Sequence, residues 1–163
     1  MLVHYLYNSP LGKLILQSNG VELTSALFFD ELKSKPELTI QTDEVLQQCI
    51  HQLQLYFEGK LKTFTVPIGQ QGTAFQQTVW QALTNIPYGK TISYLQLSKQ
   101  IHNPKAIRAV GTTNGKNQIS ILVPCHRVIG TNGSLTGYSG GLWRKKWLLA
   151  HEAKHAYGVT TLF

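Results

Sequence analysis

The chain has 163 residues, of which 42% are hydrophobic and 14% are charged, so it is apolar enough to fold as one domain or two small ones and is not a disordered tail. Lysine and arginine total 15 against 8 for aspartate and glutamate, and the resulting charge of +7 favours a polyanionic partner such as nucleic acid. The two cysteines are too few for a disulfide framework and fit a reducing compartment.

The N-terminus does not resemble a targeting signal. Residues 1–5 lack a charged segment, and Asn8-Ser9-Pro10 interrupts the first apolar run. No apolar run approaches the roughly 20 residues that a membrane helix needs. We therefore expect a cytoplasmic protein without a membrane partner.

The first part of the chain predicts an antiparallel sheet followed by one helix. Asn19-Gly20 is its strongest hairpin signal. The predicted strands are residues 2–7, 13–18, 21–29 and 64–68. The helix is predicted to run from an N-cap at Thr42 to Gly59. Cys49 lies on its apolar stripe, which places this cysteine in the core.

The second part predicts mostly helices, after a linker at residues 69–72. The helices are expected to begin after Thr73, near Ser93, after an Asn103-Pro104 cap and at Leu142. The second and third of them, joined by a short turn, have the pattern of a helix-turn-helix. The last helix is expected to carry Trp143, Trp147 and Leu148 on one side.

The third of these helices, expected over residues 105–113, has an unusual composition for a DNA reader. Arg108 is its one long donor, among the small residues Ala106, Ala109 and Gly111. Small residues let a helix approach a surface closely, which suits the minor groove, where width and backbone are read more than sequence. The alternative is a packed helix with one solvated arginine.

A polar trio, Cys125-His126-Arg127, stands inside an apolar run from Ile121 to Ile129. One interpretation is a small buried cysteine in a strand. The other is a nucleophile, which requires a base and an orienting partner, and His126 and Glu152 are the candidates. Adjacent residues of an extended strand point in opposite directions, so Cys125 and His126 would need a turn or a water between their side chains.

The segment His151-Glu152-Ala153-Lys154-His155 matches the helix motif of zinc proteases. A catalytic zinc site needs a third protein ligand, and the sequence offers no evident one. We therefore expect no metal site here.

The string Pro124-Cys125-His126-Arg127-Val128 resembles the acceptor motif of the O6-alkylguanine-DNA alkyltransferase (methylated-DNA–protein-cysteine methyltransferase) family. The resemblance runs from about Thr73 to His155 and extends weakly over the N-terminal part. Further residues match the family at its spacing: Tyr94, Arg108, Asn117, Tyr138 and Glu152. The resemblance implies an α+β protein with a ribonuclease-H-like antiparallel-sheet lobe over 1–70. It also implies a mostly helical lobe over 73–163, with a winged-helix-like helix-turn-helix.

The resemblance implies direct DNA repair by a suicide enzyme. The alkyl (methyl) group would pass in a single turnover from O6 of guanine in duplex DNA to Cys125, after the base is flipped through the minor groove. We also expect O4-alkylthymine to react. The implied partner is double-stranded DNA carrying O6-alkylguanine. The protein would act as a monomer without cofactor or metal, and the sequence leaves cooperative binding open.

The resemblance also implies roles for individual residues. The catalytic roles are Cys125 as nucleophile and alkyl acceptor, His126 as base through a water, Glu152 orienting His126, Tyr94 donating to guanine N3 and turning the phosphate, and Asn117 supporting the site. The DNA-binding residues are Arg108 as a finger in the duplex, Ala109, Gly111 and Tyr94. The pocket residues are Val128, Tyr138 and Ser139. In the family, the serine N–H reaches O6, and the carbonyls at Cys125 and Val128 take the exocyclic amine.

The chain departs from the family at Gln118 and Ser120, where prolines are frequent. We expect a looser segment there and poorer reaction with bulky adducts such as benzyl. Three other functions remain as alternatives: a cysteine hydrolase, a non-catalytic marker of DNA lesions, and a transcription regulator. The non-catalytic relatives lack the cysteine, and the regulators carry an additional metal-binding domain.

Overall fold

The computed structural model describes residues 1–158, and the chain divides into two compact units. The first unit is Met1–Gln70 with the short segment Gln118–Ser120, and the second is Gln71–Asn117 with the chain from Ile121 onward. The first is built on an antiparallel sheet and the second is mostly helical, which confirms the predicted α+β class. No helix within residues 1–158 is long and apolar enough to cross a membrane.

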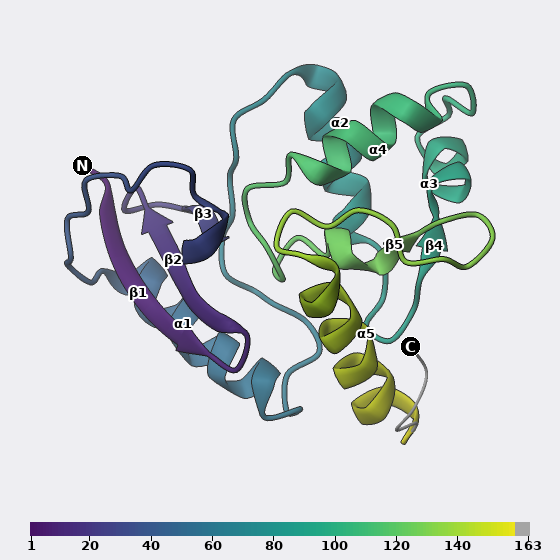
Figure 1. The fold of residues 1–163 in the computed structure, drawn as a ribbon. Helices are drawn as coiled ribbons and strands as arrows, with labels where there is room; N and C mark the ends of the chain where they lie inside the picture. Colours follow the sequence, from purple (N-terminus) through teal and green to yellow (C-terminus); the bar gives the residue numbers. More distant parts are fainter. Residues whose placement is uncertain (159–163) are drawn as a thin grey trace. The chain divides into compact units, whose positions relative to one another are not determined.

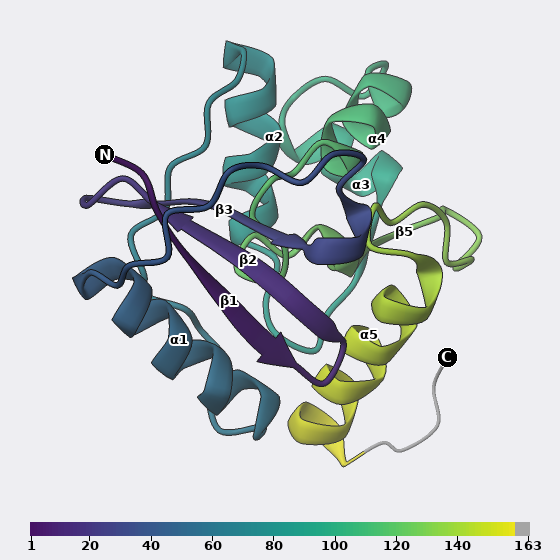
Figure 2. The ribbon, with the colours of Figure 1, turned by 60° about the vertical axis from the view of Figure 1, so that its left-hand side comes forward.

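A three-stranded antiparallel sheet and one helix form the first unit (Figure 1). The strands β1 (Val3–Ser9), β2 (Gly12–Ser18) and β3 (Leu23–Phe28) lie in the order β1-β2-β3, with a short 3-10 turn after β3. Helix α1 (Glu44–Phe57) packs along this sheet, as Figure 2 shows from a second side. Cys49 is fully buried in this packing, which confirms its assignment to the core.

Three details of this unit differ from the sequence-based predictions. Strand β3 begins at Leu23 because the Asn19 carboxamide accepts hydrogen bonds from the N–H groups of the two residues before Leu23, so the turn is longer. The N-cap of α1 is Asp43, whose carboxylate accepts from the Leu46 N–H at 2.8 Å, and not Thr42. Residues 64–68 form no strand and contribute a single bridge to Leu23.

The segment Gln118–Ser120 is held against β3 by two backbone hydrogen bonds. The Ala26 N–H donates to the Gln118 carbonyl at 2.8 Å, and the Ser120 N–H donates to the Ala26 carbonyl at 2.9 Å. The expectation that this segment is loose without proline is therefore wrong. A proline at 120 would remove the second of these donors.

The second unit contains four helices and a small parallel sheet in its described part. Its elements are α2 (Ala74–Thr84), β4 (Ile92–Ser93), α3 (Tyr94–Gln100), α4 (Ile107–Gly115), β5 (Val128–Ile129) and α5 (Leu142–Tyr157). Helices α3 and α4 pack on each other and on α2, which confirms the predicted helix pair. Strand β4 pairs in parallel with β5, and this pairing places Tyr94, at the start of α3, close to the chain that follows Cys125.

The starts of α2 and α3 are as predicted, and the start of α4 is not. Thr73 and Ser93 each form a capping box with a glutamine three residues later. Asn103 caps no helix: its carbonyl accepts from the Ala106 N–H at 3.0 Å in a turn with proline in second place, so α4 begins only at Ile107.

The predicted common side of Trp143 and Leu148 on α5 is also wrong. Leu148 is fully buried, whereas Trp143 is 57% exposed. The two positions are five residues apart, which turns them about 140° from each other around a helix.

Candidate active site

Two tight turns shape the chain at Cys125. Pro124, with φ −82° and ψ 63°, is the centre of an inverse γ-turn in which the Cys125 N–H donates to the Val123 carbonyl at 2.8 Å. A single 3-10 turn over Cys125–Arg127 follows. The chain is therefore not extended here, and the three polar side chains point in different directions although their residues are adjacent. All three are buried.

Two asparagines from the α4 region hold this turn in place. The Asn117 amide donates to the Val123 carbonyl at 2.9 Å. The Asn114 amide donates to the carbonyl of Cys125 itself at 3.3 Å. Both side chains are buried, so the two hydrogen bonds form away from water and fix the cysteine relative to α4.

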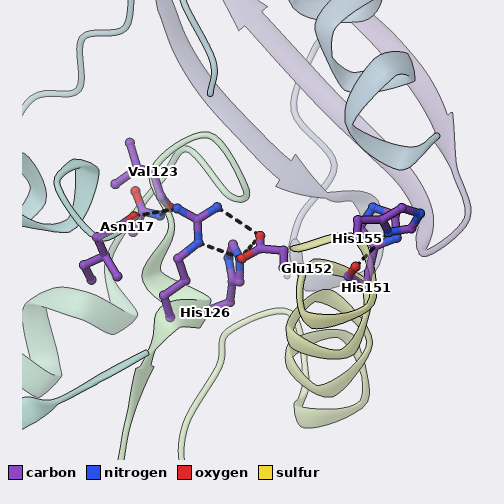
Figure 3. Close-up of polar contacts among 8 residues, drawn as sticks. Asn117, Val123, His126, His151, Glu152 and His155 are labelled. Atoms are coloured by element: carbon purple, nitrogen blue, oxygen red, sulfur yellow. Dashed lines mark hydrogen bonds and ion pairs between the residues drawn. The ribbon is translucent and has the colours of Figure 1, made fainter. Parts of the chain in front are cut away.

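Glu152 on α5 accepts hydrogen bonds from both residues that follow the cysteine, and Figure 3 shows it beside His126. His126 Nε2 lies 2.7 Å from Glu152 Oε2. Arg127 donates from Nε to Oε1 at 2.7 Å and from Nη2 to Oε2 at 3.1 Å, and its third donor reaches the Ile86 carbonyl at 2.7 Å. Such a two-point contact between guanidinium and carboxylate is both strong and directional.

The charge states of this group follow from burial and from Arg127. Burial by itself would raise the pKa of Glu152, but its contacts with His126 and Arg127 hold that pKa well below its usual range. Complete burial lowers the pKa of His126, because it disfavours the imidazolium more than Glu152 favours it. His126 is therefore neutral at neutral pH, and Arg127 is the lasting counterion of the ionised Glu152.

The tautomer of His126 follows from these charge states. An ionised carboxylate can only accept, so the hydrogen of the neutral imidazole is on Nε2, facing Glu152. Nδ1 then carries a lone pair. It is buried, and no hydrogen-bond partner for it is found among residues 1–158. The side chain next to Cys125 thus has the electronic form of a base.

A pocket of about 160 Å³ opens beside Cys125. The residues that line it come from α3, α4, the cysteine turn and the loop before α5: Tyr94, Gly111, Asn114, Gly115, Cys125, Gly137, Tyr138 and Ser139. The Tyr94 hydroxyl donates to the Thr136 carbonyl at 3.1 Å, which connects α3 to that loop. Val128, expected at the pocket, is fully buried and is not among the lining residues.

Lys145 on α5 joins the loop to β5. It is fully buried, and its ammonium donates to the carbonyls of Val128 at 2.6 Å, Thr136 at 2.9 Å and Gly137 at 3.2 Å. Burial lowers the pKa of Lys145 to about 8. The pocket wall thus depends on one buried cation.

The remaining expected residues lie on α4 and α5. Arg108 and Ala109 are exposed on α4, and Gly111 faces the pocket. On α5, Glu152 extends toward His126, whereas His151 and His155 lie on another side of the helix (Figure 3). Within residues 1–158 no group of three metal-ligating side chains occurs.

Sequence reasoning named Arg127 in the polar trio without giving it a role, and it missed Asn114 and Lys145. One signal was available for Arg127, because an arginine inside an apolar run needs a buried acid. Asn114 and Lys145 act on backbone carbonyls, which no side-chain pattern reveals.

Comparison with known proteins gives the same family over both units of the chain. Residues 2–70 match the family model described as 6-O-methylguanine DNA methyltransferase, ribonuclease-like domain, and residues 74–154 match the DNA binding domain of the same enzyme. The methylated-DNA–protein-cysteine methyltransferase of Methanosarcina mazei is 45% identical over 153 residues, covering 93% of this chain and 97% of that protein. The Mycobacterium tuberculosis protein of the same name is 45% identical over 165 residues, covering 99% of each chain.

Among solved structures, Mycobacterium tuberculosis OGT in complex with DNA superimposes with a TM-score of 0.85 at 44% identity, covering 94% of this chain and 93% of that chain. Both lobes of the expected fold are thus accounted for by one family. The chain belongs to the methylated-DNA–protein-cysteine methyltransferase family.

Proposed function

We propose that this protein repairs O6-alkylguanine in duplex DNA by moving the alkyl group onto Cys125. The observation that carries the proposal is the His126–Glu152 pair beside a cysteine that lines a pocket. The relatives that match over nearly the full chain are named as methyltransferases of this kind, and one was crystallised with DNA. A cysteine hydrolase would leave this relationship unexplained.

The reaction is an in-line displacement with a simple balance of bonds. The Cys125 thiol gives its proton to the Nδ1 lone pair of His126, through a water, and the thiolate attacks the alkyl carbon. A carbon–sulfur bond forms as the carbon–O6 bond breaks, and the electron pair of that bond passes to the base. The base takes up a proton and leaves as guanine. A thioether is a poor leaving group, so each molecule reacts once.

The substrate base lies inside a duplex and must leave the stack to enter the pocket. Arg108 and Ala109, exposed on α4, would enter the minor groove, with Arg108 filling the space of the flipped base. Tyr94 would leave the Thr136 carbonyl and donate to guanine N3, where it offsets charge on the leaving base. Asn117 supports the turn, and Tyr138 and Ser139 close the pocket over the base.

The finer aspects of the function belong to the same proposal. The protein acts in the cytoplasm as a monomer, needs no cofactor, and accepts O4-alkylthymine as a second substrate. Bulky adducts such as benzyl react poorly, because Gln118 and Ser120 lack the apolar surface of the prolines that are frequent at these positions.

The test is the intact mass of the protein after mixing with duplex DNA that contains O6-methylguanine. We expect one added methyl group per molecule, located on Cys125 by peptide mapping, with no further turnover. The Cys125→Ala variant should bind the same DNA and gain no mass. Tight binding without any mass gain in the unmodified protein would instead indicate a lesion sensor.

A further inference from the structure

Asn114 contributes a side chain to the pocket that the family resemblance does not assign. It lies in the last turn of α4, and the other α4 residues that line the pocket are Gly111 and Gly115. These glycines have no side chains, so within the described chain the Asn114 carboxamide is the only α4 side chain at the pocket.

Within residues 1–158 the nitrogen of this carboxamide has a hydrogen-bond partner and the oxygen has none. Its nitrogen donates to the Cys125 carbonyl at 3.3 Å, which fixes the orientation of the group. Its oxygen, Oδ1, is buried and has no hydrogen-bond partner among residues 1–158. Tyr94 interacts with the same carboxamide, but its hydroxyl donates to the Thr136 carbonyl. Most buried acceptors in proteins have a hydrogen-bond donor. We therefore expect the donor for this oxygen to be on the ligand.

The chemistry of the substrate identifies that donor. An alkyl group on O6 removes the hydrogen from N1 of guanine, so the exocyclic amine is the only donor left on the base. O4-alkylthymine has no exocyclic amine and carries no donor at all. An acceptor in the pocket can therefore distinguish the two alkylated bases.

We infer that Asn114 Oδ1 accepts a hydrogen bond from the exocyclic amine of O6-alkylguanine, which makes Asn114 a specificity-determining residue. The inference rests on the proposed function. The two carbonyls that the resemblance gives to this amine each accept one hydrogen bond here, that of Cys125 from Asn114 and that of Val128 from Lys145 at 2.6 Å, and each can accept a second. Asn114 Oδ1 adds a buried acceptor at the pocket that lacks a donor among residues 1–158.

The test compares two duplexes that differ by one amine. One contains O6-methylguanine and the other O6-methylhypoxanthine, which has the same methyl group and lacks the 2-amine. Single-turnover rates of methyl transfer are measured for the unmodified protein and for Asn114→Leu, with Asn114→Ala as a second variant if the first does not fold. Asn85→Leu, at an exposed position after α2, is the matched control.

We expect Asn114→Leu to slow O6-methylguanine about tenfold more than O6-methylhypoxanthine, since one neutral hydrogen bond is worth about a factor of ten in rate. Asn114→Leu also removes the donor to the Cys125 carbonyl, so Asn114→Asp, which keeps an acceptor oxygen and loses this same donor, is the reference variant. Asn114→Asp should retain the preference for O6-methylguanine that Asn114→Leu loses. The ratio of the O4-methylthymine rate to the O6-methylguanine rate should be higher for Asn114→Leu than for the unmodified protein. If Asn114→Leu lowered the transfer rate by the same factor for all three substrates, the inference would be overturned and Asn114 would be a positioning residue. Failure of the unmodified protein to accept methyl from any duplex would refute the proposed function instead.

Discussion

Glu152→Gln tests the arrangement behind Cys125 with a change of one atom. The carboxylate accepts from His126 at 2.7 Å and from Arg127 at 2.7 and 3.1 Å. Glutamine has only one acceptor oxygen, so its NH2 group must face one of these donors. If it faces His126, the imidazole must move its hydrogen from Nε2 to Nδ1, and the lone pair that would take the cysteine proton is lost.

Two magnitudes follow from the structure. Glu152 is 1% exposed, and removal of one partner of a buried ion pair costs about 3–5 kcal/mol of unfolding free energy because the other charge stays behind. Loss of a correctly oriented base lowers the rate by a factor of about 10² to 10⁴. Urea unfolding gives the first quantity, and single-turnover methyl transfer to an O6-methylguanine duplex gives the second. Glu37→Gln, on an exposed loop, is the control.

The stability difference should depend on pH. The pKa of Glu152 is lowered in the folded state, so its contribution is complete above the unfolded value of about 4.3 and is lost as the pH falls further. The difference in unfolding free energy between the unmodified protein and Glu152→Gln should therefore become smaller as the pH falls from about 5 to about 3. A folded variant that transfers methyl at the unmodified rate would refute the role of Glu152, and a pH-independent difference would refute its ionisation.

Three further outcomes can be measured. Lys145→Met should slow methyl transfer and speed amide hydrogen exchange in residues 136–139, because three carbonyls lose their buried donor; unchanged exchange would contradict this. Burial raises the pKa of Cys49 to about 12, so iodoacetamide at neutral pH should modify Cys125 in the native protein and leave Cys49 unmodified, as peptide mass mapping can check. Ser120→Pro should lower the free energy of unfolding by about 1–3 kcal/mol, because the Ala26 carbonyl loses its donor, and a Ser120→Ala control should lose less.

The sequence predicts those parts of the fold that local chemistry determines. The starts of α2 and α3 are recognisable because a threonine or serine is followed three residues later by glutamine, and both partners of the capping box lie within four residues. Asn103 is misleading for the same reason: asparagine before proline is compatible with a cap and with a turn, and packing beyond the local sequence decides between them.

The residues of the site also divide into those that the sequence predicts and those that it does not. Cys125, His126 and Glu152 can be named from the resemblance, and the structure brings His126 and Glu152 into contact. Lys145 could not be predicted, since its partners are backbone carbonyls 8 to 17 residues away and every residue has a carbonyl. The segment 118–120 belongs to the first unit through hydrogen bonds with Ala26, a partner more than 90 residues earlier that no local pattern indicates.

The 3-10 turn explains why three different chemical groups can occupy consecutive positions. With about three residues per turn, neighbouring side chains point about 120° apart. Cys125 can therefore line the pocket while His126 and Arg127 both reach the same carboxylate on α5. An extended strand would turn His126 away from both neighbours. The order Cys-His-Arg thus joins the proposed nucleophile, its proposed base and the cation that keeps Glu152 ionised within one short turn.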